Sequence, residues 1–107
     1  MLVRTDLTRE QQLVQAVHAA HEAGIRWGTP GKINSVVICA VPDEVDLVSQ
    51  AERLKNQGIN TYLFREPDLD GQCTALATAP VVKQERRFFS CLPLWHSEPQ
   101  ESHNGTD

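Results

Sequence analysis

The sequence predicts a small α/β domain in which helices pack on a mixed sheet of four strands. The first observation is the order of its segments, because short apolar or β-branched runs alternate with longer runs of helical periodicity. The second is length, because 107 residues suffice for one domain with its own core. The third is composition, since 40% apolar and 22% charged residues are typical of a globular chain.

The first helix is predicted over residues 8–27, after a short N-terminal strand. Thr8 and Gln11 fit the capping box that starts many helices, and Gly24 or Gly28 ends this one. Its apolar residues recur at helical spacing and predict one buried stripe, formed by Leu13, Val14, Val17, Ala20 and Gly24. The opposite side of the helix is expected to carry a polar line, formed by Gln11, Gln15, His18 and Glu22.

The remaining elements follow in the same alternation. A continuous β-branched run over 35–41 predicts a central strand that is covered on both faces. A second helix is predicted over 43–57, with an acidic first turn and an apolar stripe formed by Leu47, Val48, Ala51 and Leu54. Strands over 61–64 and 73–78 are expected to pair antiparallel, because their connection is too short for a parallel crossover. A last helix over 81–92 is apolar at Val82, Phe88, Phe89 and Leu92.

Charge divides the chain into a domain and a tail. The net charge is −4, but residues 96–107 hold three acids and no Lys or Arg. We predict that this stretch is a disordered, dispensable acidic tail and that residues 1–95 form the domain. The domain is then close to neutral, so overall charge neither indicates nor excludes a nucleic-acid partner.

Cysteine usage and hydropathy indicate the compartment. The three cysteines (Cys39, Cys73 and Cys91) are odd in number and lie in apolar segments, which favours buried thiols in a reducing interior over disulfides. No run of about 18 apolar residues could span a bilayer, and the N-terminus lacks the apolar stretch of a signal peptide. We therefore expect a cytoplasmic protein that does not contact a membrane.

Motifs for phosphate-binding loops and dinucleotide folds are absent from the sequence. His18 and His21 lie at i, i+3 on one helix and could bind a metal. No third ligand is evident, and ordinary helix histidines are the simpler interpretation. We expect no metal and no cofactor.

Two charged clusters are candidates for a site. Glu66, Asp68 and Asp70 lie in the loop before Thr74, and loops at strand ends are favoured places for sites. The alternative is a solvated turn in which Asp70-Gly71 supplies the positive φ angle. The second cluster lies on one side of the last predicted helix and consists of Lys83, Arg86 and Arg87. It is either a basic patch that binds phosphates or a solvated face of the helix.

Short motifs across residues 2–92 resemble the type 2 peptidyl-tRNA hydrolases. The opening Arg4-Thr5-Asp6-Leu7 is similar to that family's first turn, and Gln15-Ala16-Val17-His18-Ala19 is similar to its Gln-x-x-His-Ala helix. The stretch from Thr74 to Pro80 resembles the family's threonine-led final strand. Glu66-Pro67 with Cys73 is most similar to the divergent branch called peptidyl-tRNA hydrolase domain-containing proteins.

The resemblance implies cleavage of the ester between a peptide and its tRNA, in a site that activates water and stabilises an oxyanion. Thr74 matches the family threonine, Asp68 or Glu66 matches the loop carboxylate that orients water, and His18 and Gln15 match the helix pair. We expect Asp68, Thr74 and His18 to border one groove. The substrate is expected to contact Arg9, Glu66, Lys83, Arg86 and Arg87. Relatives are commonly dimeric, so the resemblance also suggests a homodimer.

The chain departs from that family at the start of the first helix. Family members carry lysines there, one of them assigned to catalysis, whereas this chain has Arg9 as its only cation in the stretch. The family's second threonine also has no counterpart. A non-catalytic module that binds tRNA or a protein is therefore the alternative function, and hydrolysis of another small ester or amide is the third.

Overall fold

A computed structural model describes residues 1–32 and 34–96, and the predicted tail lies outside these ranges except for His96. Its strands are β1 (Leu2–Arg4), β2 (Cys39–Val41), β3 (Thr61–Glu66) and β4 (Gln72–Thr78). They form one sheet in the order β2-β1-β4-β3. β1 pairs parallel with β2 and antiparallel with β4, while β3 and β4 pair antiparallel. The predicted mixed α/β sheet and its antiparallel pair are confirmed.

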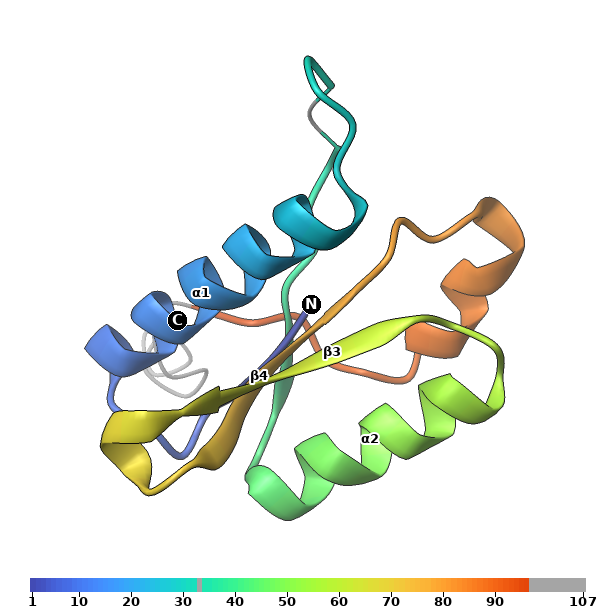
Figure 1. The fold of residues 1–107 in the computed structure, drawn as a ribbon. Helices are drawn as coiled ribbons and strands as arrows, with labels where there is room; N and C mark the ends of the chain where they lie inside the picture. Colours follow the sequence, from blue (N-terminus) through green and yellow to red (C-terminus); the bar gives the residue numbers. More distant parts are fainter. Residues whose placement is uncertain (33, 97–107) are drawn as a thin grey trace, which may run out of the picture.

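Two α-helices, α1 (Arg9–Trp27) and α2 (Glu44–Asn56), lie on opposite faces of this sheet (Figure 1). Neighbouring residues of a strand point to opposite faces. Accordingly, Leu76 belongs to the cluster under α2, whereas Ala75 and Ala77 pack with Ala19 of α1. Two short 3₁₀ helices, η1 (Pro67–Leu69) and η2 (Lys83–Phe89), complete the fold.

The helix caps and the α2 stripe agree with the sequence. The hydroxyl of Thr8 accepts a hydrogen bond from the Gln11 amide at 3.2 Å, and the Asp43 carboxylate caps α2 through the Asp46 amide at 2.9 Å. Three of the four predicted stripe residues of α2 are buried, namely Leu47, Ala51 and Leu54. Val48 is the fourth, and it lies at the margin with 37% of its surface exposed.

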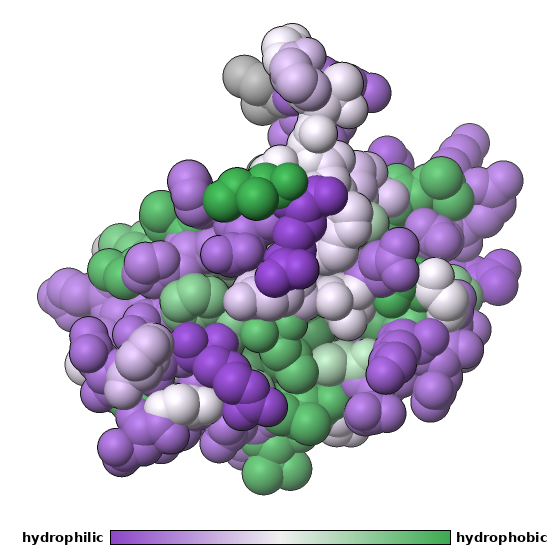
Figure 2. Space-filling view, in the orientation of Figure 1, coloured by the Kyte–Doolittle hydropathy of each residue, from purple (hydrophilic) through white to green (hydrophobic). Residues whose placement is uncertain are grey.

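The predicted packing face of α1 is wrong. Leu13 and Val17 are 56% and 67% exposed, and Figure 2 shows apolar side chains among polar ones on the surface over this helix. The buried residues are instead Gln12, Gln15 and Ala19. The sheet offers α1 small side chains and polar partners. Glutamines can therefore fill the interface, because the hydrogen bonds of their amides offset the cost of removing them from water.

The predicted central strand over 35–41 is also shorter and differently placed. Only Cys39–Val41 forms β2, which is an edge strand of the sheet rather than a central one. Val36 and Val37 are about three-fifths exposed, at 61% and 59%. The free side of β2 is covered by the segment before His96, because Ala40 N donates to Pro93 O at 2.8 Å and Trp95 N donates to Ile38 O at 2.9 Å.

The last predicted helix, over 81–92, is the shorter 3₁₀ helix η2. Its apolar residues Phe88 and Phe89, with Leu92 beyond it, pack against the cluster under α2 as expected. A 3₁₀ helix has three residues per turn, so residues at i and i+3 align and those at i+4 do not. Lys83 and Arg86 therefore share one side of η2, and Arg87 is turned away from them.

Candidate functional site

An irregularity in β4 directs Thr74 toward α1. In the pairing of β3 with β4, Phe64 lies opposite Ala75 but Arg65 lies opposite Cys73, so Thr74 is an extra residue without a partner. Strict alternation from Ala75 would turn Thr74 to the α2 side. The bulge instead places Cys73 in the α2 cluster and lets the Thr74 hydroxyl reach α1. The sequence gives no signal of this bulge.

Four of the predicted site residues are joined by consecutive hydrogen bonds. The Thr74 hydroxyl donates to Gln15 Oε1 at 2.7 Å, and Gln15 Nε2 donates to Glu66 Oε1 at 2.8 Å. The second Glu66 oxygen accepts the Asp68 backbone N–H at 3.2 Å. One helix residue thus connects the bulge of β4 to the carboxylate at the end of β3.

These contacts determine the ionisation of Glu66. The hydrogen bond from Gln15, then that from the Asp68 amide and the charge of His18, hold the pKa of the Glu66 carboxyl below its ordinary value. An ionised carboxylate that already accepts two hydrogen bonds is a weak base. Glu66 is therefore suited to holding the loop in place rather than to taking a proton.

Asp68 lies in η1, directly after Glu66, and its side chain is exposed. Across residues 1–32 and 34–96, its carboxylate has no hydrogen-bond or ion-pair partner, while its backbone N–H is fixed by Glu66. Of the two loop carboxylates that the sequence left open, Asp68 is thus the one that can receive a proton from a water molecule. Asp70 takes the left-handed conformation at φ 57°, as expected for the turn.

His18 lies beside this network on an aromatic ring of β3. Its ring stacks on Phe64 with 4.8 Å between centroids and 7° between planes. His18 is exposed, whereas Thr74 is fully buried beneath Gln15. The structure therefore brings Gln15, His18, Glu66, Asp68 and Thr74 together, with Thr74 under the surface rather than at the border of a groove.

The expected cationic contacts do not join this group. Arg9 is exposed on the first turn of α1. Lys83, Arg86 and Arg87 are exposed on η2, and Figure 1 shows η2 and the β3–β4 turn at opposite ends of the molecule. The prediction that three charges share one side of this helix is wrong, because only Lys83 and Arg86 align. The Arg87 guanidinium lies over the Phe88 ring, 4.9 Å from its centre.

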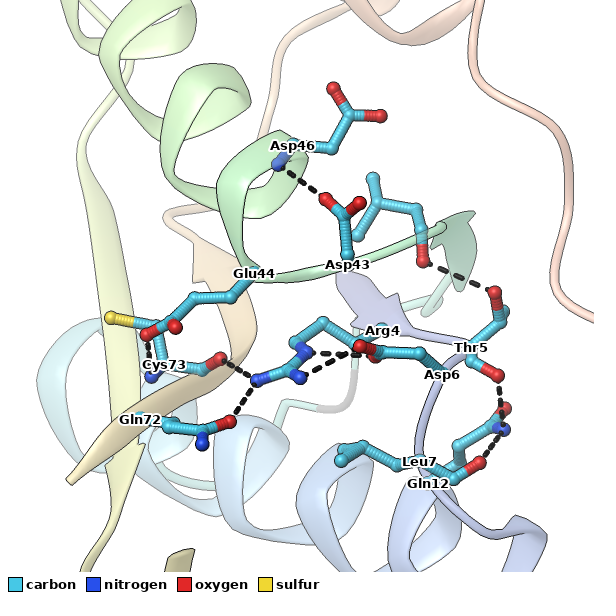
Figure 3. Close-up of polar contacts among 11 residues, drawn as sticks. Arg4, Thr5, Asp6, Leu7, Gln12, Asp43, Glu44, Asp46, Gln72 and Cys73 are labelled. Atoms are coloured by element: carbon cyan, nitrogen blue, oxygen red, sulfur yellow. Dashed lines mark hydrogen bonds and ion pairs between the residues drawn. The ribbon is translucent and has the colours of Figure 1, made fainter. Parts of the chain in front are cut away.

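A buried arginine supports the start of β4 and was not predicted as a site residue (Figure 3). The Arg4 guanidinium binds both carboxylate oxygens of Asp6, at 2.9 and 2.8 Å, and also donates to Gln72 Oε1 at 2.9 Å and to Cys73 O at 3.0 Å. The bond to Arg4 lowers the pKa of Asp6, and the same bond raises the pKa of Arg4. The Glu44 carboxylate accepts a hydrogen bond from the Cys73 backbone N–H at 2.8 Å. The N–H and the carbonyl oxygen of Cys73, next to the bulge, are thus both held by side chains. The pairing of Arg4 with Asp6 is visible in the sequence as an Arg-x-Asp motif. The contacts of Arg4 with Gln72 and Cys73 are not, because these residues lie far away in sequence.

Gln12 also fixes backbone groups through its side chain, near the start of α1. Its amide donates to the backbone oxygens of Thr5 and Leu7, at 3.3 and 2.7 Å. Its carbonyl oxygen accepts the indole N–H of Trp95 at 2.6 Å. The start of α1 is thereby tied to β1 and to the segment that covers β2.

Within the described residues, no group of three or more His, Cys, Asp or Glu side chains could hold a metal ion. The same part of the chain has no helix that is both long and apolar enough to cross a membrane. Cys39 and Cys73 are buried free thiols, as predicted, whereas Cys91 is exposed.

No protein-family model and no curated protein sequence matches this chain.

Proposed function

We propose that this chain hydrolyses the ester bond of peptidyl-tRNA and releases the peptide and free tRNA. The observation that carries the proposal is the hydrogen-bonded series of Thr74, Gln15 and Glu66. These residues come from β4, α1 and β3, and the resemblance to type 2 peptidyl-tRNA hydrolases selected all three. Their direct contact supports a common role for them.

Asp68 is the general base in this proposal. Its carboxylate takes a proton from a water molecule while the water oxygen attacks the ester carbonyl carbon. The bond from that carbon to the ribose oxygen then breaks, and the proton passes from Asp68 to the ribose oxygen. The products are the peptide carboxylic acid and the free ribose hydroxyl, so water is the only co-reactant.

Gln15 and Thr74 position the groups around the ester. One N–H of the Gln15 amide is donated to Glu66, and we assign its second N–H to the developing oxyanion, where a fixed donor is most effective. Thr74 is a positioning residue, because its hydroxyl proton is donated to Gln15 and fixes which end of the amide faces the loop. His18 is exposed on the same side and contacts the substrate.

A specific observation favours the alternative, a non-catalytic module that binds tRNA. Thr74 and Gln15 are only 0% and 3% exposed, and the first turn of α1 has only Arg9 as a cation. A site that has lost its lysine and buried its threonine could retain binding without hydrolysis, because function depends on the site and not on the fold.

A single-turnover assay separates the two functions. Excess protein is mixed with tRNA that carries a labelled, N-blocked peptide, and release of the peptide is followed over time. A parallel binding measurement uses the uncharged tRNA. Release of peptide together with binding supports the hydrolase, whereas binding without release supports the module. If neither occurs, both proposals are wrong.

A further inference from the structure

Two planar side chains of α1 lie flat on aromatic rings of β3. The Arg26 guanidinium carbon is 4.0 Å from the centre of the Tyr62 ring, and the His18 ring is stacked on Phe64 at 4.8 Å. Tyr62 and Phe64 are two residues apart on β3, so they point to the same face of the sheet. Together these four residues form what we call the stacking strip.

The outer surface of the strip is open. His18 is exposed, and the Arg26 side chain retains 45% of its surface. One face of each plane is covered by an aromatic ring, so the opposite face and the edges are the parts that solvent reaches. Each plane is thus held in place before any ligand arrives, which lowers the entropic cost of stacking on it.

The strip leads directly to the proposed site. Along β3, the side chains on this face are Tyr62, Phe64 and Glu66, at steps of about 6.7 Å. They meet Arg26, His18 and Gln15 of α1 in that order. A chain laid along the strip would therefore end beside Glu66 and Asp68.

We propose that the stacking strip binds the unpaired 3′-terminal nucleotides of tRNA by base stacking, with the terminal ribose at Asp68. This inference rests on the proposed function, because the ester lies at that end of the tRNA. Unpaired RNA bases are recognised by stacking on aromatic rings and on arginine planes. The Glu22 carboxylate lies 3.4 Å from the Arg26 guanidinium and partly neutralises its charge. Arg26 is therefore better suited to stacking on a base than to binding a phosphate. Stacking rather than phosphate binding then supplies the affinity, and the dependence on salt is weak.

The test measures binding of a short, fluorescently labelled single-stranded RNA that ends in the CCA sequence shared by tRNAs. Replacing Tyr62→Ala, His18→Ala or Arg26→Leu should weaken binding about 5- to 150-fold each, the loss seen when one stacked base loses its platform. His18→Phe should retain binding, because it keeps a ring. Arg26→Lys should lose most of it, because it keeps the charge but not the plane.

Matched controls lie on other faces of the same elements. Arg65→Ala is on the opposite face of β3, and Val17→Ala removes an exposed side chain on the outer face of α1. Both controls should bind the RNA as the unmodified chain does. The same RNA in a fully base-paired duplex should bind at least about 5-fold more weakly, because its bases are already stacked on each other.

Two results would overturn the inference: unchanged binding in Tyr62→Ala and Arg26→Leu, or full binding in Arg26→Lys. Failure of the proposed function gives a different pattern. If the RNA binds and the strip variants lose it while peptidyl-tRNA is not hydrolysed, the strip stands and the hydrolase does not. If hydrolysis occurs and the strip variants bind normally, the hydrolase stands and the strip does not.

Discussion

Gln12 and Gln15 occupy positions of α1 that face the sheet, where apolar side chains are usual. The oxygen and the nitrogen of each amide have a partner, which offsets the cost of their burial, and Gln15 keeps one N–H that is not donated within the described residues. Among the described residues, no buried side-chain polar atom lacks a partner. The hydrogen-bond partners of the two glutamines include Thr74, Glu66 and Trp95, which are distant from them in sequence. The local periodicity of α1 therefore could not have indicated that the glutamines face the sheet.

The Thr74 hydroxyl gives a prediction on stability. Thr74→Val removes the donor to Gln15 Oε1, which remains buried, and should lower the free energy of unfolding by about 1–3 kcal/mol. Thr78→Val, a half-buried position in the same strand, is the matched control and should stay within about 0.5 kcal/mol. Urea unfolding measures both. Equal stability of the two variants would show that the Thr74 bond contributes nothing.

Glu66 gives a prediction on pH dependence. Its pKa is lowered from 4.5 in the folded chain, mainly by the Gln15 bond, so the folded state holds the ionised carboxylate more favourably than the unfolded state does. The stabilisation is present above about pH 4.5 and is lost as the pH falls through the folded pKa. In thermal unfolding, the advantage of the unmodified chain over Glu66→Gln should be present at about pH 6 and should shrink below about pH 4.5. A constant difference down to pH 3 would contradict this.

At the scale of elements, capping and turn chemistry were predictable and helix orientation was not. The caps of both helices, the α2 stripe and the β3–β4 pair follow from local residues. The face of α1 follows from what the sheet offers it, which is small residues and hydrogen-bond partners. The same applies to β2, whose three residues pair with the three residues of β1 and whose other edge meets a segment near residue 95.

Truncations on the two helices test their opposite orientations. Leu47 is fully buried in the α2 cluster, and Leu47→Ala should cost about 2–5 kcal/mol. Val17 is 67% exposed on α1, and Val17→Ala should change stability by less than about 0.5 kcal/mol. Chemical denaturation of both variants decides the matter. A loss above about 1 kcal/mol in Val17→Ala would show that the outer face of α1 is covered in solution.

At the scale of the whole molecule, the proposed site and the basic pair of η2 lie at opposite ends. If Lys83 and Arg86 contact tRNA phosphates, replacing both with Gln should reduce the slope of log affinity against log salt by about one unit per lost contact. Arg87→Gln, on another side of η2, should reduce it less. Binding of intact tRNA across a salt series gives these slopes. An unchanged slope in the double variant would exclude the pair from the tRNA interface.

The central claim is that Asp68 activates water at a site assembled by Gln15, Glu66 and Thr74. The most direct test is the single-turnover rate of peptidyl-tRNA hydrolysis by Asp68→Asn at saturating enzyme. Asp70→Asn, in the same turn, is the control, because Asn tolerates the left-handed backbone at this position. The account predicts that Asp68→Asn lowers the rate about 10²- to 10⁴-fold with little change in tRNA affinity, while Asp70→Asn keeps the rate of the unmodified chain. Equal rates for the two variants would contradict the assignment of Asp68, and no hydrolysis by the unmodified chain would contradict the function itself.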